Sequence, residues 1–190
     1  MEEAIKTQYR LIEERFVKIA WTHKIQEVQG NLYLKKLQCQ KNTMAVVNAL
    51  TTTSAIATVL SNFDIKWLMP VITAALAVLS SYFTFRYKDG TLESLAKANK
   101  QYAAKCRTLR NAYESLLADI MSCRIANLDE IAEARKGLED AENELFCGAV
   151  APHTTEDAVK IACIALKQDH ESQTEEDEIR SIVPTTLQVV

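Results

Sequence analysis

Two stretches of this chain contain no charged residue, and only the short connector Ser61–Lys66 separates them. The first stretch runs from about Thr43 to Leu60, and the second from about Trp67 to Phe85. A helix needs about 20 mostly apolar residues to cross the hydrocarbon core of a bilayer, with a usable range of about 17–25. Both stretches fit this range, so we predict two membrane-spanning helices. The alternative is a soluble protein in which two very apolar helices are buried.

The connector and the flanking charges predict how the two spans are arranged. Helices joined by so few residues must run antiparallel, so the spans are expected to form a hairpin. Basic residues flank the outer ends of this hairpin, at Lys35, Lys36, Lys41, Arg86 and Lys88, whereas the connector holds one lysine and one aspartate. Because basic residues beside membrane spans tend to stay on the cytoplasmic side, we expect both termini in the cytoplasm.

Each predicted span carries small or hydroxylated residues along one face. They are Asn48, Thr51, Ala55 and Thr58 in the first span, and Thr73, Ala77, Ser80 and Thr84 in the second. Steps of three and four residues place each set on a single helical face. Two interpretations stay open: the stripes pack helices together through close contacts and hydrogen bonds, or they line a pore. A single hairpin cannot enclose a channel, so a pore requires a homo-oligomer.

The rest of the chain is predicted to be helical as well. Only four glycines and three prolines occur in 190 residues, and such a scarcity of breakers favours long helices over strands joined by turns. We divide the chain into an N-terminal cytoplasmic helix (1–42), the transmembrane hairpin (43–86), cytoplasmic helices (91–168) and an acidic tail expected to be disordered (169–190). The expected fold class is an all-α membrane protein, with a two-helix transmembrane hairpin and a cytoplasmic helical bundle.

Apolar side chains recur with helical spacing in both cytoplasmic parts. In the N-terminal helix they lie at Ile5, Tyr9, Ile12, Phe16 and Ile19, a seam typical of coiled coils. The helix that follows the hairpin holds a second seam, which we take as the candidate contact between copies: Leu95, Asn99, Tyr102, Leu109, Tyr113 and Leu116. A polar residue within such a seam fixes register or oligomer number in some coiled coils, or it is simply tolerated there.

Two further helix starts are predicted from their capping residues. Asn127 with Glu130 has the pattern of a capping box, and Thr154 with Asp157 has the same spacing before a short helix. Between them, the charged residues from Glu130 to Glu144 indicate a solvated helix face.

No set of residues in the sequence indicates catalysis. The three histidines stand at no metal-ligand spacing with each other or with a cysteine, and no glycine-rich phosphate loop is present. We therefore expect no enzyme activity, no catalytic residue, no metal and no cofactor, and a net charge of −3 gives no reason to expect nucleic-acid binding. The five cysteines form no C-x-x-C pair, so we expect reduced thiols that face the core.

The order of these parts resembles a known family. A helix leads into a tight two-span hairpin, and the basic flank Phe85-Arg86-Tyr87-Lys88 follows it. Next come the long helix LAKANKQYAAKCRTLRNAYESLL and the segment ELFCGAVAPHTTEDAVKIA, which begins at Glu144. This layout, over about residues 5–168, resembles the SLATT family, the two-span effector domains associated with SMODS nucleotidyltransferases and SLOG proteins.

The resemblance implies a function that the spacing of residues does not show. SLATT proteins are regarded as effectors of bacterial antiphage systems that disrupt the inner membrane when a partner senses infection. By this resemblance the chain is expected in the bacterial inner membrane, in contact with lipid and with other copies of itself. Its signal would come from a separate sensor protein or a cyclic nucleotide. Two other functions stay open: a membrane-anchored scaffold or receptor that recruits partners, and a small channel subunit.

Overall fold

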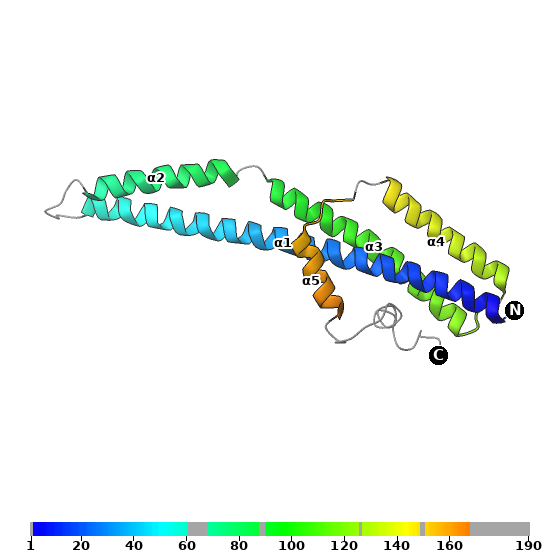
Figure 1. Cartoon of the computed structure of the whole chain (residues 1–190). Coiled ribbons are helices and arrows are strands. Elements are labelled where there is room, and N and C mark those ends of the chain that lie inside the picture. Colours follow the sequence, from blue (N-terminus) through cyan, green and yellow to red (C-terminus); the bar gives the residue numbers. More distant parts are fainter. Residues whose placement is uncertain (1, 61–67, 88–89, 126, 149–150, 168–190) are drawn as a thin grey trace. The chain divides into compact units, whose positions relative to one another are not determined.

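The computed structural model describes residues 2–60, 68–87, 90–125, 127–148 and 151–167. These residues form five helices, α1 (Glu2–Leu60), α2 (Leu68–Tyr87), α3 (Thr91–Met121), α4 (Leu128–Gly148) and α5 (Glu156–Lys167) (Figure 1). None of the described residues is in a strand, which confirms the all-helical part of the prediction. The predicted connector 61–66 and the acidic tail 169–190 lie outside the described residues.

α1 continues without a break from the N-terminal segment into the first apolar stretch. It is 59 residues long, and it passes residues 42 and 43, where the sequence placed a boundary between two parts. In the ranges that the structure describes, no helix is both long and apolar enough to cross a membrane.

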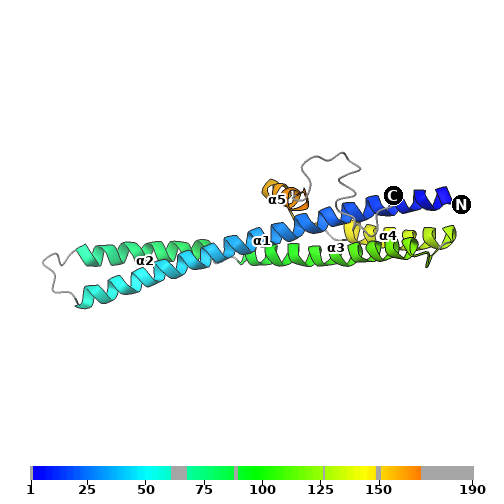
Figure 2. The same cartoon turned by 90° about the horizontal axis from the view of Figure 1, so that it is seen from below.

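The chain divides into two compact units. Residues 31–96 form one, which we call the hairpin unit, and residues 1–30 with 97–190 form the other, which we call the bundle unit. Within the bundle unit, α3 runs beside the N-terminal half of α1, and α4 runs beside α3 (Figure 1, Figure 2). The two apolar seams predicted from the sequence therefore pack against each other within one chain.

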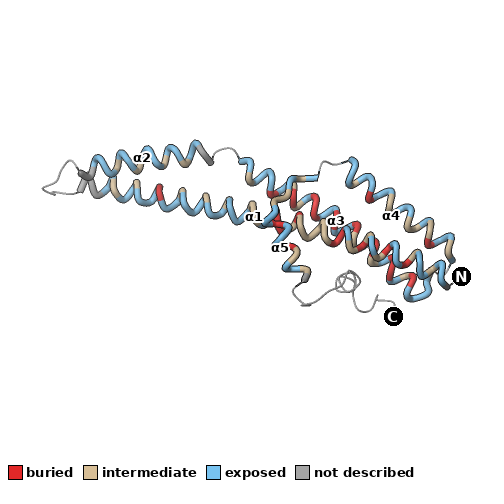
Figure 3. The backbone as a smooth tube through the Cα atoms, viewed as in Figure 1, coloured by how far each residue is buried: buried red, intermediate tan, exposed pale blue. Residues whose placement is uncertain are grey.

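The core of the bundle unit is formed by side chains of α1, α3 and α4, and most buried positions lie along these helices (Figure 3). The core residues are Tyr9, Ile12, Phe16, Ile19, Tyr102, Cys106, Leu109, Tyr113, Leu116, Leu117, Ile120 and Ile131. Those of α1 and α3 recur at helical spacing, and α4 adds Ile131 and the partly buried Ala134, Leu138 and Leu145, so each helix turns one apolar stripe inward. Burial of this apolar surface stabilises the unit, because it removes the stripes from water.

The caps of α4 and α5 differ in how well the sequence predicted them. The backbone N–H of Asp129 donates to Oδ1 of Asn127 at 3.2 Å, so Asn127 caps α4 as predicted. At α5 the prediction of Thr154 is wrong by one residue. The hydroxyl of Thr155 accepts from the backbone N–H of Ala158 at 3.4 Å, and α5 begins at Glu156. Thr155 is also bound by Gln29 of α1, which fixes it as the capping residue.

The cysteines do not all face the core, contrary to expectation. Cys106 is fully buried, whereas Cys39, Cys123 and Cys147 are exposed and Cys163 is intermediate. Only Cys106 falls on the apolar stripe of its helix. Burial raises the pKa of the Cys106 thiol to about 11, because a thiolate is poorly solvated there.

We expect Cys106 to resist thiol reagents in the folded protein. The reactive species is the thiolate, and Cys106 is both inaccessible and protonated near neutral pH. In a maleimide time course at pH 8, read by mass spectrometry of peptides, Cys106 should react at least about 100-fold more slowly than the exposed Cys123 and Cys147. Denatured protein is the control, in which all five thiols should react. Equal rates for Cys106 and Cys147 in the folded protein would contradict the core assignment.

Candidate functional site

Within the hairpin unit, two side-chain hydrogen bonds join α1 and α2. Ser80 of α2 donates its hydroxyl to Oδ1 of Asn48 on α1 at 2.6 Å. Nearer the turn of the hairpin, Thr73 donates to the hydroxyl of Ser54 at 3.2 Å. The two pairs keep a single antiparallel register along the helices. These bonds hold α1 against α2, which is compatible with the packing interpretation; whether the stripes also line a pore stays a prediction.

The other predicted stripe residues take several positions. The Thr51 hydroxyl donates to the carbonyl oxygen of Val47 in its own helix at 2.8 Å. Ala55, Ala77 and Thr84 are exposed. The side chain of Thr58 lies outside the described ones.

Ser54 was absent from the predicted stripe, although it pairs with Thr73. Ser54 could have been included from the sequence, because it carries a hydroxyl and precedes the predicted Ala55. The assumption of a single narrow face excluded it.

The hairpin unit carries large apolar side chains on its outside. Those exposed are Leu34, Val46, Leu50, Ile56, Val71, Ile72, Val78, Leu79, Tyr82, Phe85 and Leu95. Val78 is 70% exposed and Phe85 is 83% exposed. A helix pair adapted to water turns such side chains inward and its hydroxyls outward. Here Asn48 pairs with Ser80 and Ser54 pairs with Thr73 between the helices, and the aliphatic side chains point out. Exposed hydroxyls donate to carbonyl oxygens of their own helix, as those of Thr52, Thr53 and Ser81 do. Exposed apolar side chains in this number on two helices are typical of contact with lipid or with another protein.

In the bundle unit, a buried carboxylate joins three helices. The side chain of Glu142 on α4 is 5% exposed, and its Oε1 lies 3.1 Å from Nη1 of Arg15 on α1. Its Oε2 accepts a hydrogen bond from the hydroxyl of Tyr113 on α3 at 3.0 Å. The negative charge of Glu142 raises the pKa of the Arg15 guanidinium, and burial followed by the same charge raises the pKa of the Tyr113 hydroxyl.

The expectation that residues 130–144 present only a solvated face is therefore wrong at Glu142. No local feature of the sequence separates this glutamate from its charged neighbours. The burial arises because α1 and α3 both approach the same turn of α4.

A second polar connection in the bundle unit holds the loop before α5 on α1. Gln26 donates its amide to the carbonyl oxygen of Pro152 at 3.2 Å. Gln29 accepts from the backbone N–H of Thr155 at 2.9 Å and from its hydroxyl at 2.8 Å. Both glutamines are buried, so α5 is attached through hydrogen bonds shielded from water. Neither glutamine stands out in the sequence, because no local pattern marks it as buried.

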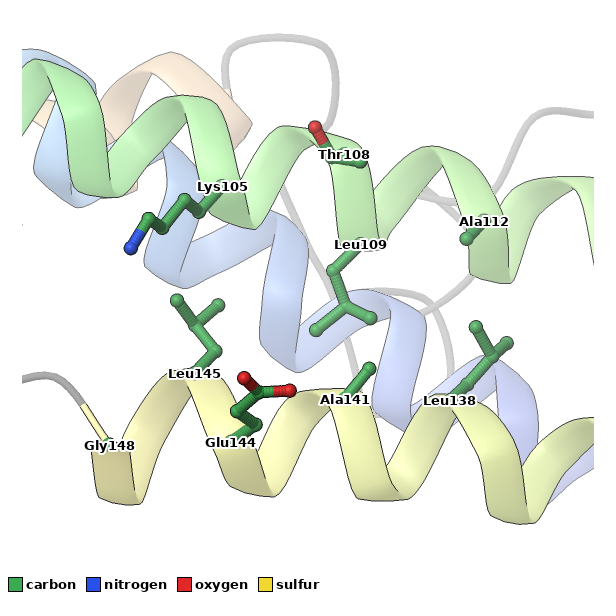
Figure 4. Close-up of a pocket in the computed structure, with 9 residues that line it drawn as sticks. All are labelled: Lys105, Thr108, Leu109, Ala112, Leu138, Ala141, Glu144, Leu145 and Gly148. Carbon is green, nitrogen blue, oxygen red and sulfur yellow. The ribbon is translucent and has the colours of Figure 1, made fainter.

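A groove lies between α3 and α4 in the bundle unit. It encloses about 570 Å³ and is mainly apolar. Leu109 of α3 points toward α4, where Ala141 and Leu145 lie opposite (Figure 4). Lys105 and Glu144 lie at its rim (Figure 4). The arrangement suits an apolar segment of a partner better than a charged small molecule, because the floor offers few hydrogen-bonding groups.

The candidate seam between copies is mostly occupied within the single chain. Asn99, Tyr102, Leu109, Tyr113 and Leu116 are buried by the chain's own helices, whereas Leu95 is 38% exposed. Use of this seam between copies stays a prediction, and it would require α3 to exchange its present neighbours for those of another chain.

Among the residues that the structure covers, no group of three or more histidine, cysteine, aspartate or glutamate side chains is close enough to hold a metal ion.

Comparison with known proteins gives one family match. The sequence model of a family described as "SMODS and SLOG-associating 2TM effector domain family 4" matches residues 9–178. No curated protein and no solved structure matches the chain.

Proposed function

The chain belongs to the SMODS and SLOG-associating 2TM effector domain family 4, and from this premise we propose that it is a membrane effector of a bacterial antiphage system. In this proposal the hairpin unit spans the inner membrane with both termini in the cytoplasm. Several copies assemble and permeabilise the membrane when a partner sensor signals. The protein performs no catalysis in this role.

The observation that carries the proposal is the inverted polarity of the hairpin unit. Asn48 pairs with Ser80 and Ser54 with Thr73 between α1 and α2, and the hydroxyls on the outer side donate to the backbone of their own helix. Large apolar residues such as Val78 and Phe85 point outward. In hydrocarbon this is the stable arrangement, because a polar group without a partner is costly there and an aliphatic side chain is not. In water the same surface would be a liability.

The hydrogen bonds between the stripes also suggest how a pore would form. A pair such as Asn48 and Ser80 is satisfied inside one hairpin. In an assembly, rotation of the helices can replace each of these bonds with one to water in a central channel. The polar face then serves both interpretations in turn: packing in the resting hairpin and lining in the open assembly.

The bundle unit is the proposed receiver of the signal. A separate sensor protein, or a cyclic nucleotide made by one, would act on the cytoplasmic helices. The groove between α3 and α4 is a surface of suitable chemistry for an apolar segment of such a protein. Any signal that changes the packing of α1 in the bundle unit reaches the hairpin unit through α1 itself, which is continuous from Glu2 to Leu60.

We expect Asn48→Leu to suppress membrane permeabilisation. Strong induction raises the concentration of copies and favours assembly by mass action, so the wild type should depolarise the inner membrane. The variant removes the amide that pairs with Ser80 and would meet water in the pore, and we expect at least about a tenfold smaller conductance, equivalent to about 1.4 kcal/mol. The measurement is a potential-sensitive dye in induced cells, with the amount of assembled protein determined in parallel.

Thr53→Leu is the matched control for this experiment. Thr53 is exposed on the opposite side of α1, and its hydroxyl donates to the carbonyl oxygen of Ala49 in its own helix. This variant should depolarise the membrane as the wild type does. An intact potential at every level of wild-type expression would contradict pore formation.

A receptor anchored by the hairpin is the second candidate function, and the groove of the bundle unit is the observation in its favour. In that case an unrelated hairpin in place of residues 43–86 leaves the activity unchanged. The pore proposal requires the opposite result.

A further inference from the structure

A second groove lies along α1 where this helix enters its first apolar stretch. It is a shallow, open depression of about 520 Å³ within the hairpin unit, and the residues that line it belong to α1. One end is lined by Lys35, Gln38 and Asn42, and the other end by Val46 and Val47. Steps of three and four residues place this set along one face of the helix. The groove therefore changes along its length from cationic and polar to apolar.

The charge at the polar end has no acidic counterpart nearby in the sequence. No aspartate or glutamate occurs between Glu27 and Asp64, while Lys35, Lys36 and Lys41 all fall in that interval and are exposed. In the part of the chain that the structure covers, no carboxylate forms an ion pair with Lys35. The polar end thus offers a positive charge to an anionic ligand.

The amides beside Lys35 are arranged to add a hydrogen-bond donor. Gln38 donates its Nε2 to Oδ1 of Asn42 at 2.8 Å. This bond uses the acceptor of Asn42 and leaves its Nδ2 to donate. A lysine ammonium and an amide N–H one or two turns apart can bind the oxygens of one phosphate group.

The groove crosses the predicted start of the membrane span. At a rise of about 1.5 Å per residue, the path along α1 from Lys35 to Val47 is about 18 Å. The hydrocarbon core is about 30 Å thick, with several further ångströms of headgroup region on each side. If the span begins at Thr43, as the sequence predicts, Val46 and Val47 lie beside acyl chains. Lys35 then lies on the cytoplasmic side, where its long side chain can extend toward the headgroups.

We propose that this groove is a binding site for one anionic phospholipid of the cytoplasmic leaflet. The lipid phosphate is bound by Lys35 and Asn42, and an acyl chain lies against Val46 and Val47. The proposal rests on the proposed function, because a lipid reaches this groove only if α1 enters the membrane there. Binding would hold α1 at a fixed depth and rotation in the membrane. This rotation determines whether the face of α1 that carries Asn48 points toward other helices.

The test compares retention of phosphatidylglycerol and phosphatidylcholine by the full-length protein, purified in detergent and measured by native mass spectrometry at equal lipid concentrations. One phosphatidylglycerol should be retained with about fivefold preference, the effect of roughly one lysine near an anionic lipid. Lys35→Gln should remove this preference. Lys36→Gln is the matched control, since it removes the same charge one residue away and outside the groove, and it should change the preference less than twofold. Val46→Trp, which fills the apolar end without a change of charge, should also abolish retention.

Equal retention of the two lipids, or equal effects of the two lysine variants, would overturn the site. Flotation of the protein with vesicles of phosphatidylcholine alone separates this result from failure of the proposed function. Protein that inserts into these neutral vesicles but shows no lipid preference contradicts only the lipid site. Protein that does not insert contradicts both.

Discussion

Replacing Arg15 with methionine should lower the free energy of unfolding of the bundle unit by about 3 kcal/mol. The reason is the position of its partner. Glu142 is 5% exposed, and Arg15 supplies the positive charge 3.1 Å from its Oε1. Without Arg15 the carboxylate stays buried with only the hydrogen bond from Tyr113, and a buried charge without its counter-ion is strongly destabilising.

Replacing Glu142 instead of Arg15 should lower the free energy of unfolding much less. Glu142→Gln leaves the Arg15 guanidinium without its partner, but that side chain is 42% exposed and can be solvated by water. The glutamine can still accept a hydrogen bond from Tyr113. We therefore expect a loss of about 1 kcal/mol. The asymmetry follows from burial alone, because the two residues lose the same ion pair.

The double variant provides the sharpest test of this explanation. With a neutral glutamine at position 142 there is no buried charge for Arg15 to compensate, so Arg15→Met with Glu142→Gln should be more stable than Arg15→Met alone. Thermal unfolding followed by circular dichroism, on full-length protein in detergent, measures all three variants. Arg124→Met is the control, because its ion pair with Asp119 at 3.3 Å is exposed on the arginine side and should contribute less than about 0.5 kcal/mol. A double variant less stable than Arg15→Met would contradict the role assigned to Arg15.

The apolar seams could be predicted from the sequence because their information is local. The spacing of Tyr9, Ile12 and Phe16 identifies one face of a helix, and that face is buried as expected. The same spacing does not identify what covers the face. Tyr113 and Leu116 were assigned to contacts between copies, yet α1 and α4 of the same chain bury them. Periodicity specifies that a stripe is buried, whereas the covering element depends on how the chain folds back.

The polar connections were beyond prediction for a related reason. Glu142 stands among other acidic and basic residues, and Gln29 stands in an ordinary stretch of helix. Each is buried because a segment more than a hundred residues away contacts it, as Thr155 contacts Gln29. The pairing of Asn48 with Ser80 was easier to predict. A short connector requires the two helices to lie side by side, so only their register was unknown.

A lysine at position 78 should prevent the hairpin unit from entering the membrane. Val78 is 70% exposed and lies near the middle of α2. Measured along the helix axis, it is about 15 Å from either end of α2. If the surrounding medium is lipid, a lysine at the centre of a span costs about 2.5–3.5 kcal/mol, which corresponds to roughly a hundredfold lower insertion. If the surrounding medium is water, a replacement at so exposed a position should change stability by less than about 0.5 kcal/mol.

The fraction of protein that stays with membranes after an alkaline carbonate wash measures the difference. Val78→Lys should be extracted, while Val78→Leu, which keeps the side chain apolar, should remain as the wild type does. Leu34→Lys provides a lysine at another exposed apolar site, since Leu34 is 44% exposed but precedes the first apolar stretch. It should also remain in the membrane. Extraction of both lysine variants would mean that added charge alone is responsible. Retention of both would mean that the apolar face of α2 does not meet lipid, and the proposed membrane effector would then have to be abandoned.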